Sequence, residues 1–146
     1  NLGSDLIREN FEKITPKNRE EVVETTKNEV MDMLKKTIRP EFLNRIDDII
    51  MFAPLNEKEI EQIVRIQLDG IKKMLAGNGI ELEYTDEAVK SIAVAGFDPE
   101  FGARPVKRLI QRKVLNQLSK DLLAGTVDKT KPIVIDAVDE TVFFKN

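Results

Sequence analysis

Residues 56–84, NEKEIEQIVRIQLDGIKKMLAGNGIELEY, decide the fold. Apolar residues recur every three or four positions from Ile60 to Leu75, which predicts an amphipathic helix with one buried face. Asn56 and Glu59 have the spacing of a capping box, so the helix is expected to begin directly after Asn56. Glycines then end it, and apolar residues that alternate with glutamates predict a half-buried strand at the end of the stretch.

The chain after this stretch continues to alternate between helices and strands. A helix is expected over 85–96, with a threonine cap and a glycine end, and a long helix is predicted from about 103 to 124. Strands are predicted at 133–138 and 142–144. Residues 54–146 thus predict an α+β domain in which helices pack on one face of a small three-stranded sheet.

The preceding residues, 1–53, are predicted to be mostly helical and to form a separate part of the chain. Apolar residues at helical spacing indicate a helix over 19–38, and Pro40 is expected to open a further short helical turn. The apolar run Asp48–Phe52 predicts a buried strand, which the following proline ends. We therefore expect a boundary between residues 53 and 54.

The composition excludes several classes of protein and site. The chain has 146 residues, 41% hydrophobic and 34% charged, which suits one domain, or one small domain with part of another, and is too apolar for a disordered chain. It has no Cys and no His, so disulfides, histidine-based triads and Cys/His zinc sites are excluded, and no metal site is expected. Its 23 basic and 26 acidic residues give a net charge of −3, and no apolar run is long enough to span a membrane.

Arg104 is the first candidate for an anion site. Pro105 is well suited to the first position of the predicted long helix, so Arg104 is placed at that helix's N-terminus. Helix N-termini favour anions, and a guanidinium beside one would complete a phosphate site. On the residues alone, the alternative is a solvated arginine that pairs with Asp98 or Glu100, and both interpretations stay open.

Arg45 is the second candidate, at a corner between the short helical turn and the predicted strand. An arginine at such a corner could reach across an interface to another subunit. Asp47 and Asp48 could equally hold its side chain, and the residues alone favour that second interpretation.

A run of basic residues along the predicted long helix is the third candidate. It consists of Arg104, Lys107, Arg108, Arg112, Lys113 and Lys120, and no acidic residue occurs from 101 to 120. A solvated helix face, or a contact with an acidic surface of another subunit, is favoured over nucleic-acid binding because no aromatic residue follows Phe101 within the run.

Sequence motifs for nucleotide hydrolysis are missing. The glycines form neither a G-x-x-x-x-G-K-[ST] phosphate loop nor a G-x-G-x-x-G fingerprint, and no run of four apolar residues ends in Asp-Glu as a Walker B strand does. The chain by itself is therefore not expected to bind nucleotide tightly or to hydrolyse it.

Three segments together resemble the C-terminal part of a Clp/Hsp-type AAA+ ATPase, and the resemblance covers essentially the whole chain. Arg39–Asp47, RPEFLNRID, is similar to the box that carries the family's arginine finger. Gly96–Arg108, GFDPEFGARPVKR, resembles the sensor 2 motif, and Asn1–Ser4 resembles the end of the sensor 1 strand. The resemblance implies that 1–53 is a remnant of the large AAA+ subdomain and that 54–146 is the small C-terminal subdomain.

The same resemblance implies roles for three residues. Arg45 would be the arginine finger, acting in trans on the neighbouring subunit's nucleotide. Arg104 would be sensor 2 and contact phosphates within its own subunit, while Asn1 would be sensor 1 and orient the attacking water. The implied cofactor is ATP or ADP with Mg²⁺ in the full-length parent, which would be an ATPase. No cofactor is expected to be tightly bound to this chain alone, which is expected to be inactive.

Within the family, the chain looks most like the ClpB-type disaggregases. The interval Leu2–Ile38 lacks the I-G-F/L tripeptide of members that feed the ClpP protease, so no ClpP partner is expected. This branch implies a cytoplasmic homohexamer that threads aggregated or unfolded polypeptide, helped by a DnaK-type chaperone, with no nucleic acid or membrane partner. Two alternatives stay open: a ClpP-dependent unfoldase with an atypical loop, and a stand-alone α+β interaction or nucleic-acid-binding domain.

Overall fold

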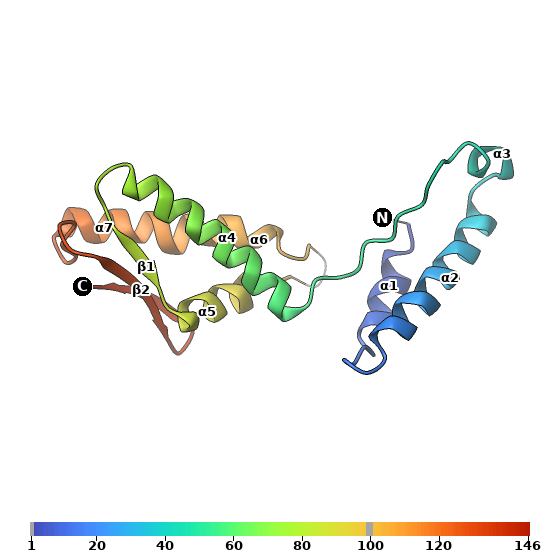
Figure 1. Cartoon of the computed structure of the whole chain (residues 1–146), viewed down its shortest axis with the longest axis horizontal. Helices are drawn as coiled ribbons and strands as arrows, with labels where there is room; N and C mark the ends of the chain where they lie inside the picture. Colours follow the sequence, from blue (N-terminus) through green and yellow to red (C-terminus); the bar gives the residue numbers. More distant parts are fainter. Residues whose placement is uncertain (1, 99–100) are drawn as a thin grey trace. The chain divides into compact units, whose positions relative to one another are not determined.

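The computed structural model describes residues 2–98 and 101–146. The chain divides into two compact units, Asn1–Pro54 and Leu55–Asn146, and each is described by itself below (Figure 1).

The first unit consists of helices α1 (Ser4–Phe11), α2 (Arg19–Thr37) and α3 (Pro40–Leu43). The predicted helix over 19–38 and the short helix that opens at Pro40 are both confirmed. Helix α1 packs against α2, which buries Thr26, Val30 and Leu34. The buried Thr26 hydroxyl accepts a hydrogen bond of 3.1 Å from Asn10 Nδ2, so its polar atom is satisfied.

The strand predicted over Asp48–Phe52 is wrong. These residues form no strand, and Ile50 and Phe52 are 71% and 83% exposed. A strand requires a neighbour for its backbone N–H and C=O groups. Within the described residues, the strands pair with one another in the second unit, and none pairs with this run. Local apolar character alone was therefore insufficient to make a strand.

The second unit has the predicted α+β order of elements. It contains α4 (Glu57–Ala76), β1 (Leu82–Tyr84), α5 (Asp86–Gly96), α6 (Arg104–Ile110), the π-helix η1 (Gln111–Asn116), α7 (Gln117–Ala124), β2 (Ile133–Val138) and β3 (Thr141–Lys145). The capping box of α4 is present: Asn56 Oδ1 accepts from the Glu59 N–H at 2.8 Å, and Glu59 Oε2 accepts from the Asn56 N–H at 2.7 Å. The helix therefore begins directly after Asn56, as the sequence predicts.

The sheet is three-stranded and mixed, with the order β1-β2-β3. Strand β1 is parallel to β2, with Leu82 opposite Ile133, and β3 is antiparallel to β2. The β2–β3 turn holds Asp139 and Glu140 at φ 49° and 65°, which is the left-handed geometry that a two-residue hairpin requires. Alternate side chains, including Ile135, point from one face of the sheet into the core, so the helices cover that face.

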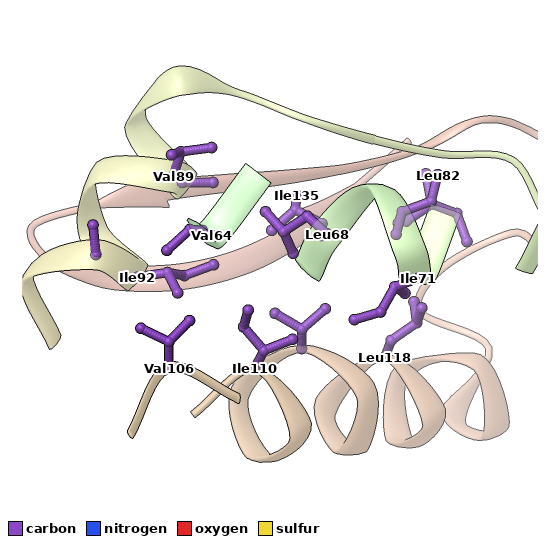
Figure 2. Close-up of a cluster of buried hydrophobic side chains, with 14 of the residues drawn as sticks. Val64, Leu68, Ile71, Leu82, Val89, Ile92, Val106, Ile110, Leu118 and Ile135 are labelled. Atoms are coloured by element: carbon purple, nitrogen blue, oxygen red, sulfur yellow. The ribbon is translucent and has the colours of Figure 1, made fainter. Parts of the chain in front are cut away.

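One apolar core holds the second unit together (Figure 2). Its side chains come from α4, α5, the α6–α7 segment and the sheet, and include Ile60, Val64, Leu68, Ile71, Leu82, Val89, Ile92, Val106, Ile110, Val114, Leu118, Ile133 and Ile135. Full burial of a Val, Leu or Ile side chain stabilises a fold by roughly 1.5–3 kcal/mol relative to exposure. These contacts are consequently the main stabilising interaction of the unit.

The last helix is continuous over the predicted range but changes its winding. Its buried residues recur at every fourth position, at Val106, Ile110, Val114 and Leu118. In an α-helix of 3.6 residues per turn, a step of four residues rotates about 40° beyond a full turn, so such a stripe would drift off the core. The π-helix takes more residues per turn, which corrects this drift. The sequence pattern of this helix does not predict the π segment.

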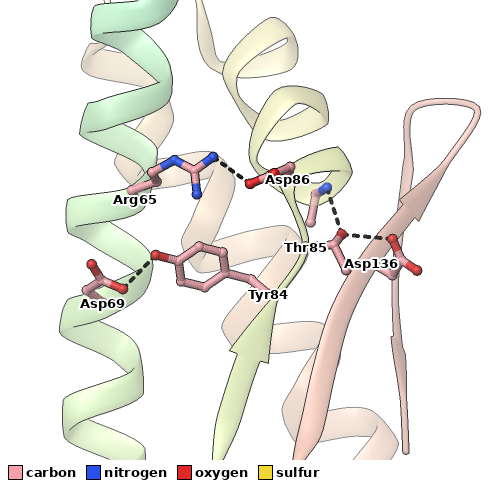
Figure 3. A network of polar contacts seen from close by, with 7 residues as sticks. Arg65, Asp69, Tyr84, Thr85, Asp86 and Asp136 are labelled. Atoms are coloured by element: carbon pink, nitrogen blue, oxygen red, sulfur yellow. Dashed lines mark hydrogen bonds and ion pairs between the residues drawn. The ribbon is translucent and has the colours of Figure 1, made fainter.

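Polar side chains tie α4, α5 and the sheet together at their surface (Figure 3). Arg65 of α4 pairs with Asp86 at 2.7 Å, which lowers the pKa of that carboxyl group. The Tyr84 hydroxyl donates to Asp69 at 2.6 Å, and its pKa is raised, mainly by burial and then by this hydrogen bond. The Thr85 hydroxyl accepts from the Ala88 N–H at 3.2 Å and so caps α5. The same hydroxyl donates to the Asp136 carboxylate of β2.

Asp136 joins the α5 cap to both long strands. It accepts hydrogen bonds from the Thr85 hydroxyl and the Ala137 N–H, each at 2.8 Å, and pairs with Lys145 at 2.7 Å. The Lys145 contact, followed by these two hydrogen bonds, lowers the pKa of Asp136 to about 2. The ionised carboxylate therefore stabilises the native state.

Replacing Gly96 should show how closely α5 approaches α6. A Cβ built at Gly96 would lie 2.8 Å from Val106 Cγ2 and 3.1 Å from Val106 Cα, so backbone as well as side chain would have to move. We expect Gly96→Ala to lower the free energy of unfolding by about 1–3 kcal/mol, measured by urea denaturation.

Gly70 provides the matched control, because it lies within α4 and a Cβ there would meet no atom within 4 Å. Gly70→Ala should raise the stability by roughly 0.5–1 kcal/mol through helix propensity. If both variants changed stability in the same direction, the close α5–α6 approach would not be the reason for Gly96.

The Asp136 contacts predict a specific dependence of stability on pH. Because the pKa of Asp136 falls from 3.8 to about 2 on folding, its stabilising contribution is complete above pH 3.8 and is lost as the pH falls towards 2. Asp136→Asn should lower the Tm by a few degrees at pH 7, and the gap from the native chain should narrow between pH 4 and pH 2. Circular dichroism melts at each pH measure this, with Glu140→Gln in the exposed hairpin turn as the control. A gap that stayed constant with pH would contradict the assignment.

Candidate functional site

Arg45 lies directly after α3, in a turn whose backbone is well held. Its N–H donates to the Phe42 carbonyl at 3.1 Å, and the next residue, Ile46, donates to Leu43 at 3.1 Å. Pro40 begins the short helix because its fixed φ suits a first helical turn. The corner predicted from the sequence is therefore present, although no strand follows it.

The Arg45 side chain is exposed and has no ion pair or hydrogen bond with any residue that the structure describes. Asp48, one of its two proposed local partners, instead accepts a hydrogen bond from the Ile49 N–H at 2.8 Å. A neutralising Arg45–Asp47 or Arg45–Asp48 contact is thus not formed here. The guanidinium is left available to an anion from outside the unit.

Arg104 is the first residue of α6, and Pro105 follows in the second position rather than opening the helix. Just before it in the chain, Asp98 and Gly102 exchange backbone hydrogen bonds at 2.9 and 2.6 Å. Gly102 has φ 64°, a left-handed value that favours glycine. The Asp98–Gly102 bridge and the turn at Gly102 therefore lie directly before the helix that Arg104 begins.

Arg104 is exposed, and its guanidinium has no partner within residues 2–98 and 101–146. Of the two carboxylates proposed as its partners, Asp98 accepts from the Phe101 N–H at 3.0 Å, and Glu100 lies outside the described residues. A cation that is neither buried nor paired can engage an anionic group with little desolvation cost.

The remaining predicted site residue, Asn1, lies outside the described residues. Arg45 belongs to the first unit and Arg104 to the second.

The basic run is divided by the structure into two groups. Lys107, Arg108 and Arg112 line a surface hollow of about 270 Å³ together with Gln111, whereas Lys113 and Lys120 are exposed elsewhere on the helix. The spacing of the charges in sequence could not separate these groups, because their separation depends on how the helix is wound.

No cluster of three or more Asp, Glu, His or Cys side chains in the described part of the chain could hold a metal ion. Among the same residues, no helix combines the length and the apolar character that crossing a bilayer takes.

Comparison with known proteins gives one family. Residues 55–135 match the family model described as the C-terminal, D2-small domain of ClpB protein. The chain is 58% identical over all 146 residues to the chaperone protein ClpB of Porphyromonas gingivalis, and equally to that of Bacteroides thetaiotaomicron. It is also 44% identical over 136 residues, 93% of the chain, to the mitochondrial chaperone protein ClpB3 of Oryza sativa subsp. japonica.

These alignments cover only part of each relative. The chain spans 17% of the length of the two bacterial relatives and 14% of the rice protein. The α+β architecture, the match to the D2-small domain and the identity over the whole chain agree with one another. The chain belongs to the ClpB chaperone family, as a C-terminal part of such a protein.

Proposed function

We propose that this chain forms part of an ATP-driven, ClpB-type disaggregase, in which Arg45 and Arg104 act on two different nucleotides. The observation that carries the proposal is that both arginines are exposed and free of carboxylate partners among the described residues, on a chain 58% identical throughout to ClpB relatives. Arginines with a purely structural role would be expected to pair locally.

In this proposal Arg104 contacts nucleotide phosphates within its own subunit. Its place at the start of α6, directly after the turn at Gly102, presents a guanidinium without a competing carboxylate. Asn1 would orient the attacking water. Other parts of the parent would supply the phosphate loop and the residues that hold Mg²⁺, because this sequence lacks the motifs. When bound, ATP supplies the phosphoryl group whose hydrolysis drives the chaperone.

Arg45 is proposed to act in trans, on the nucleotide of the neighbouring subunit. An arginine that stabilises the charge of a phosphoryl-transfer transition state raises the rate by about 10³–10⁵-fold. Such an arginine must be held rigidly in position, and its charge must have no partner before the reaction. The turn after α3 fits both requirements, since its backbone is hydrogen-bonded while the side chain is not.

The parent is proposed to be a cytoplasmic homohexamer that threads aggregated or unfolded polypeptide, working with a DnaK-type chaperone and without ClpP. The ClpB relatives support the chaperone class, and the interval Leu2–Ile38 without an I-G-F/L tripeptide supports independence from ClpP.

The isolated chain should be silent as an ATPase. It lacks a phosphate loop, so Arg104 has no backbone cradle or lysine beside it to hold the β- and γ-phosphates. Phosphate release from the purified chain should equal that of its Arg104→Ala variant. Turnover clearly above that variant would overturn this expectation.

In the full-length parent, the two arginine variants should fail in different ways. Arg45→Ala should reduce kcat by about 10³-fold or more while leaving nucleotide affinity of the mutated subunit nearly unchanged, because its partner charge develops only in the transition state. Arg104→Ala should instead weaken nucleotide binding, because phosphate charge is present in the ground state. Steady-state kinetics and binding of a fluorescent nucleotide measure these two effects.

Arg8→Ala, which removes an exposed arginine from the first unit, serves as the control and should retain activity. In mixed rings with Walker B-dead subunits, Arg45→Ala should silence the adjacent site. Loss of affinity at its own site as large as that of Arg104→Ala would make Arg45 a local structural residue.

A further inference from the structure

The turn between α4 and β1 contains the dipeptide Asn78-Gly79 (Figure 1). It is the one place in the sequence where a glycine directly follows an asparagine. Both residues are exposed, and a Cβ built at Gly79 would meet no atom within 4 Å. The dipeptide therefore lies at the surface, with open space beside the glycine.

An asparagine before a glycine has a reaction path of its own. The backbone nitrogen of the glycine attacks the asparagine Cγ and gives up its proton to solvent, while the Cγ–Nδ2 bond breaks. The side-chain nitrogen takes up a proton and leaves as ammonia. Water then opens the cyclic succinimide at either carbonyl and leaves aspartate or isoaspartate, so the sum is hydrolysis of one amide and no oxidant or reductant takes part. Glycine favours ring closure because it has no Cβ to hinder the attack.

Backbone hydrogen bonds oppose this reaction in the folded chain. The Ile80 N–H donates to the Leu75 carbonyl at 3.0 Å. The Gly79 N–H donates to the Ala76 carbonyl at 3.1 Å. With Gly79 at φ 76°, these two bonds form a Schellman motif, which satisfies carbonyl groups at the end of a helix. The attacking nitrogen is therefore engaged by Ala76, and the ring can close only after this bond opens.

The Asn78 side chain is held in the same turn. Its Nδ2 donates to the Met74 carbonyl at 3.1 Å, so the group that would leave is also engaged. Helix ends fray, however, and exposed turns open locally at a much lower cost in free energy than the core. The closed turn thus protects Asn78, and each opening of the turn releases the attacking nitrogen and the side-chain amide together.

We propose that Asn78 is a site of spontaneous deamidation, and that opening of the Schellman motif at the end of α4 sets the rate. Water is the only co-reactant. Neither Arg45 nor Arg104 takes part, so this inference stands apart from the proposed nucleotide contacts.

Both products weaken the turn from which they form. An aspartate carboxylate accepts hydrogen bonds but donates none, so it loses the contact with the Met74 carbonyl and adds negative charge at the negative end of the helix dipole. Isoaspartate inserts one more carbon into the backbone, between the residues that the Ile80–Leu75 hydrogen bond spans. Deamidation therefore loosens the connection from α4 to β1.

Peptide mapping by mass spectrometry after incubation tests the site and its protection by the fold. The intact 146-residue chain is kept in warm, mildly alkaline buffer, with and without denaturing urea. Asn78 should convert to a mixture of aspartate and isoaspartate, several-fold faster in urea than in the native state. Asn56 is the internal control and should stay intact in the native chain, because Glu57 follows it and its side chain caps α4.

Two variants separate opening of the motif from unfolding of the whole unit. Ile80→Ala removes a half-buried side chain within the motif and should speed deamidation in the native state several-fold. Leu109→Ala removes a half-buried side chain from α6 that packs against the same core, and should leave the native rate nearly unchanged. Equal acceleration by both variants would show that global unfolding, and not the motif, sets the rate.

The effect of the product is measured with a stable mimic. Asn78→Asp should lower the Tm by a few degrees, whereas Gln62→Glu, the same change of amide to carboxylate in the first half of α4, should not. An unchanged Tm in Asn78→Asp would contradict the expected weakening of the turn. The proposal is overturned if Asn78 deamidates no faster than Asn56, or if its rate in the native chain equals its rate in urea.

Discussion

The apolar stripe of the last helix must face the core along its whole length, and much of the second unit depends on this constraint. Val106 packs so closely against α5 that a Cβ at position 96 would lie 2.8 Å from its Cγ2, while Leu118 at the far end lies in the same core as Leu82 and the sheet. A stripe at every fourth residue cannot stay on one side of a regular α-helix. The π segment resolves this conflict by changing the winding. The cations of the same helix lie outside the core, with Lys107, Arg108 and Arg112 around one surface hollow and Lys113 and Lys120 elsewhere.

A second layer of organisation is polar and lies at the edges of the core. The Arg65–Asp86 pair connects α4 to the start of α5, and Asp136 connects the α5 cap to β2 and β3. Exposed ion pairs contribute little individually. The Arg65–Asp86 pair and the Thr85–Asp136 hydrogen bond nevertheless join elements that are 21 and 51 positions apart in sequence. The surface of the unit therefore reinforces the geometry that burial establishes.

The cations proposed to act on phosphates share one property, which is the lack of a carboxylate partner among the described residues. Arg65, Lys72 and Lys145, in contrast, each have a carboxylate partner within 3 Å. Unsatisfied charge at Arg45 and Arg104 is consistent with contacts made outside the folded unit, in an assembly or with a ligand.

The sequence by itself determined the features that depend on near neighbours. The capping box at Asn56, the helix after Thr85 and the α+β order of elements follow from residues within a few positions of one another, so local propensity and periodicity predict them. The ordered motifs around Arg45 and Arg104 likewise single out these two residues from the sequence. Whether nearby carboxylates pair with them depends on distances in the folded chain, which the motifs do not contain. Only the tertiary structure decided that Asp48–Phe52 forms no strand, that residues 111–116 wind as a π-helix, and that Thr85 meets Asp136 across 51 positions. Strand pairing, helix winding and contacts between distant residues depend on which groups the folded chain brings together, and a one-dimensional pattern does not contain those distances.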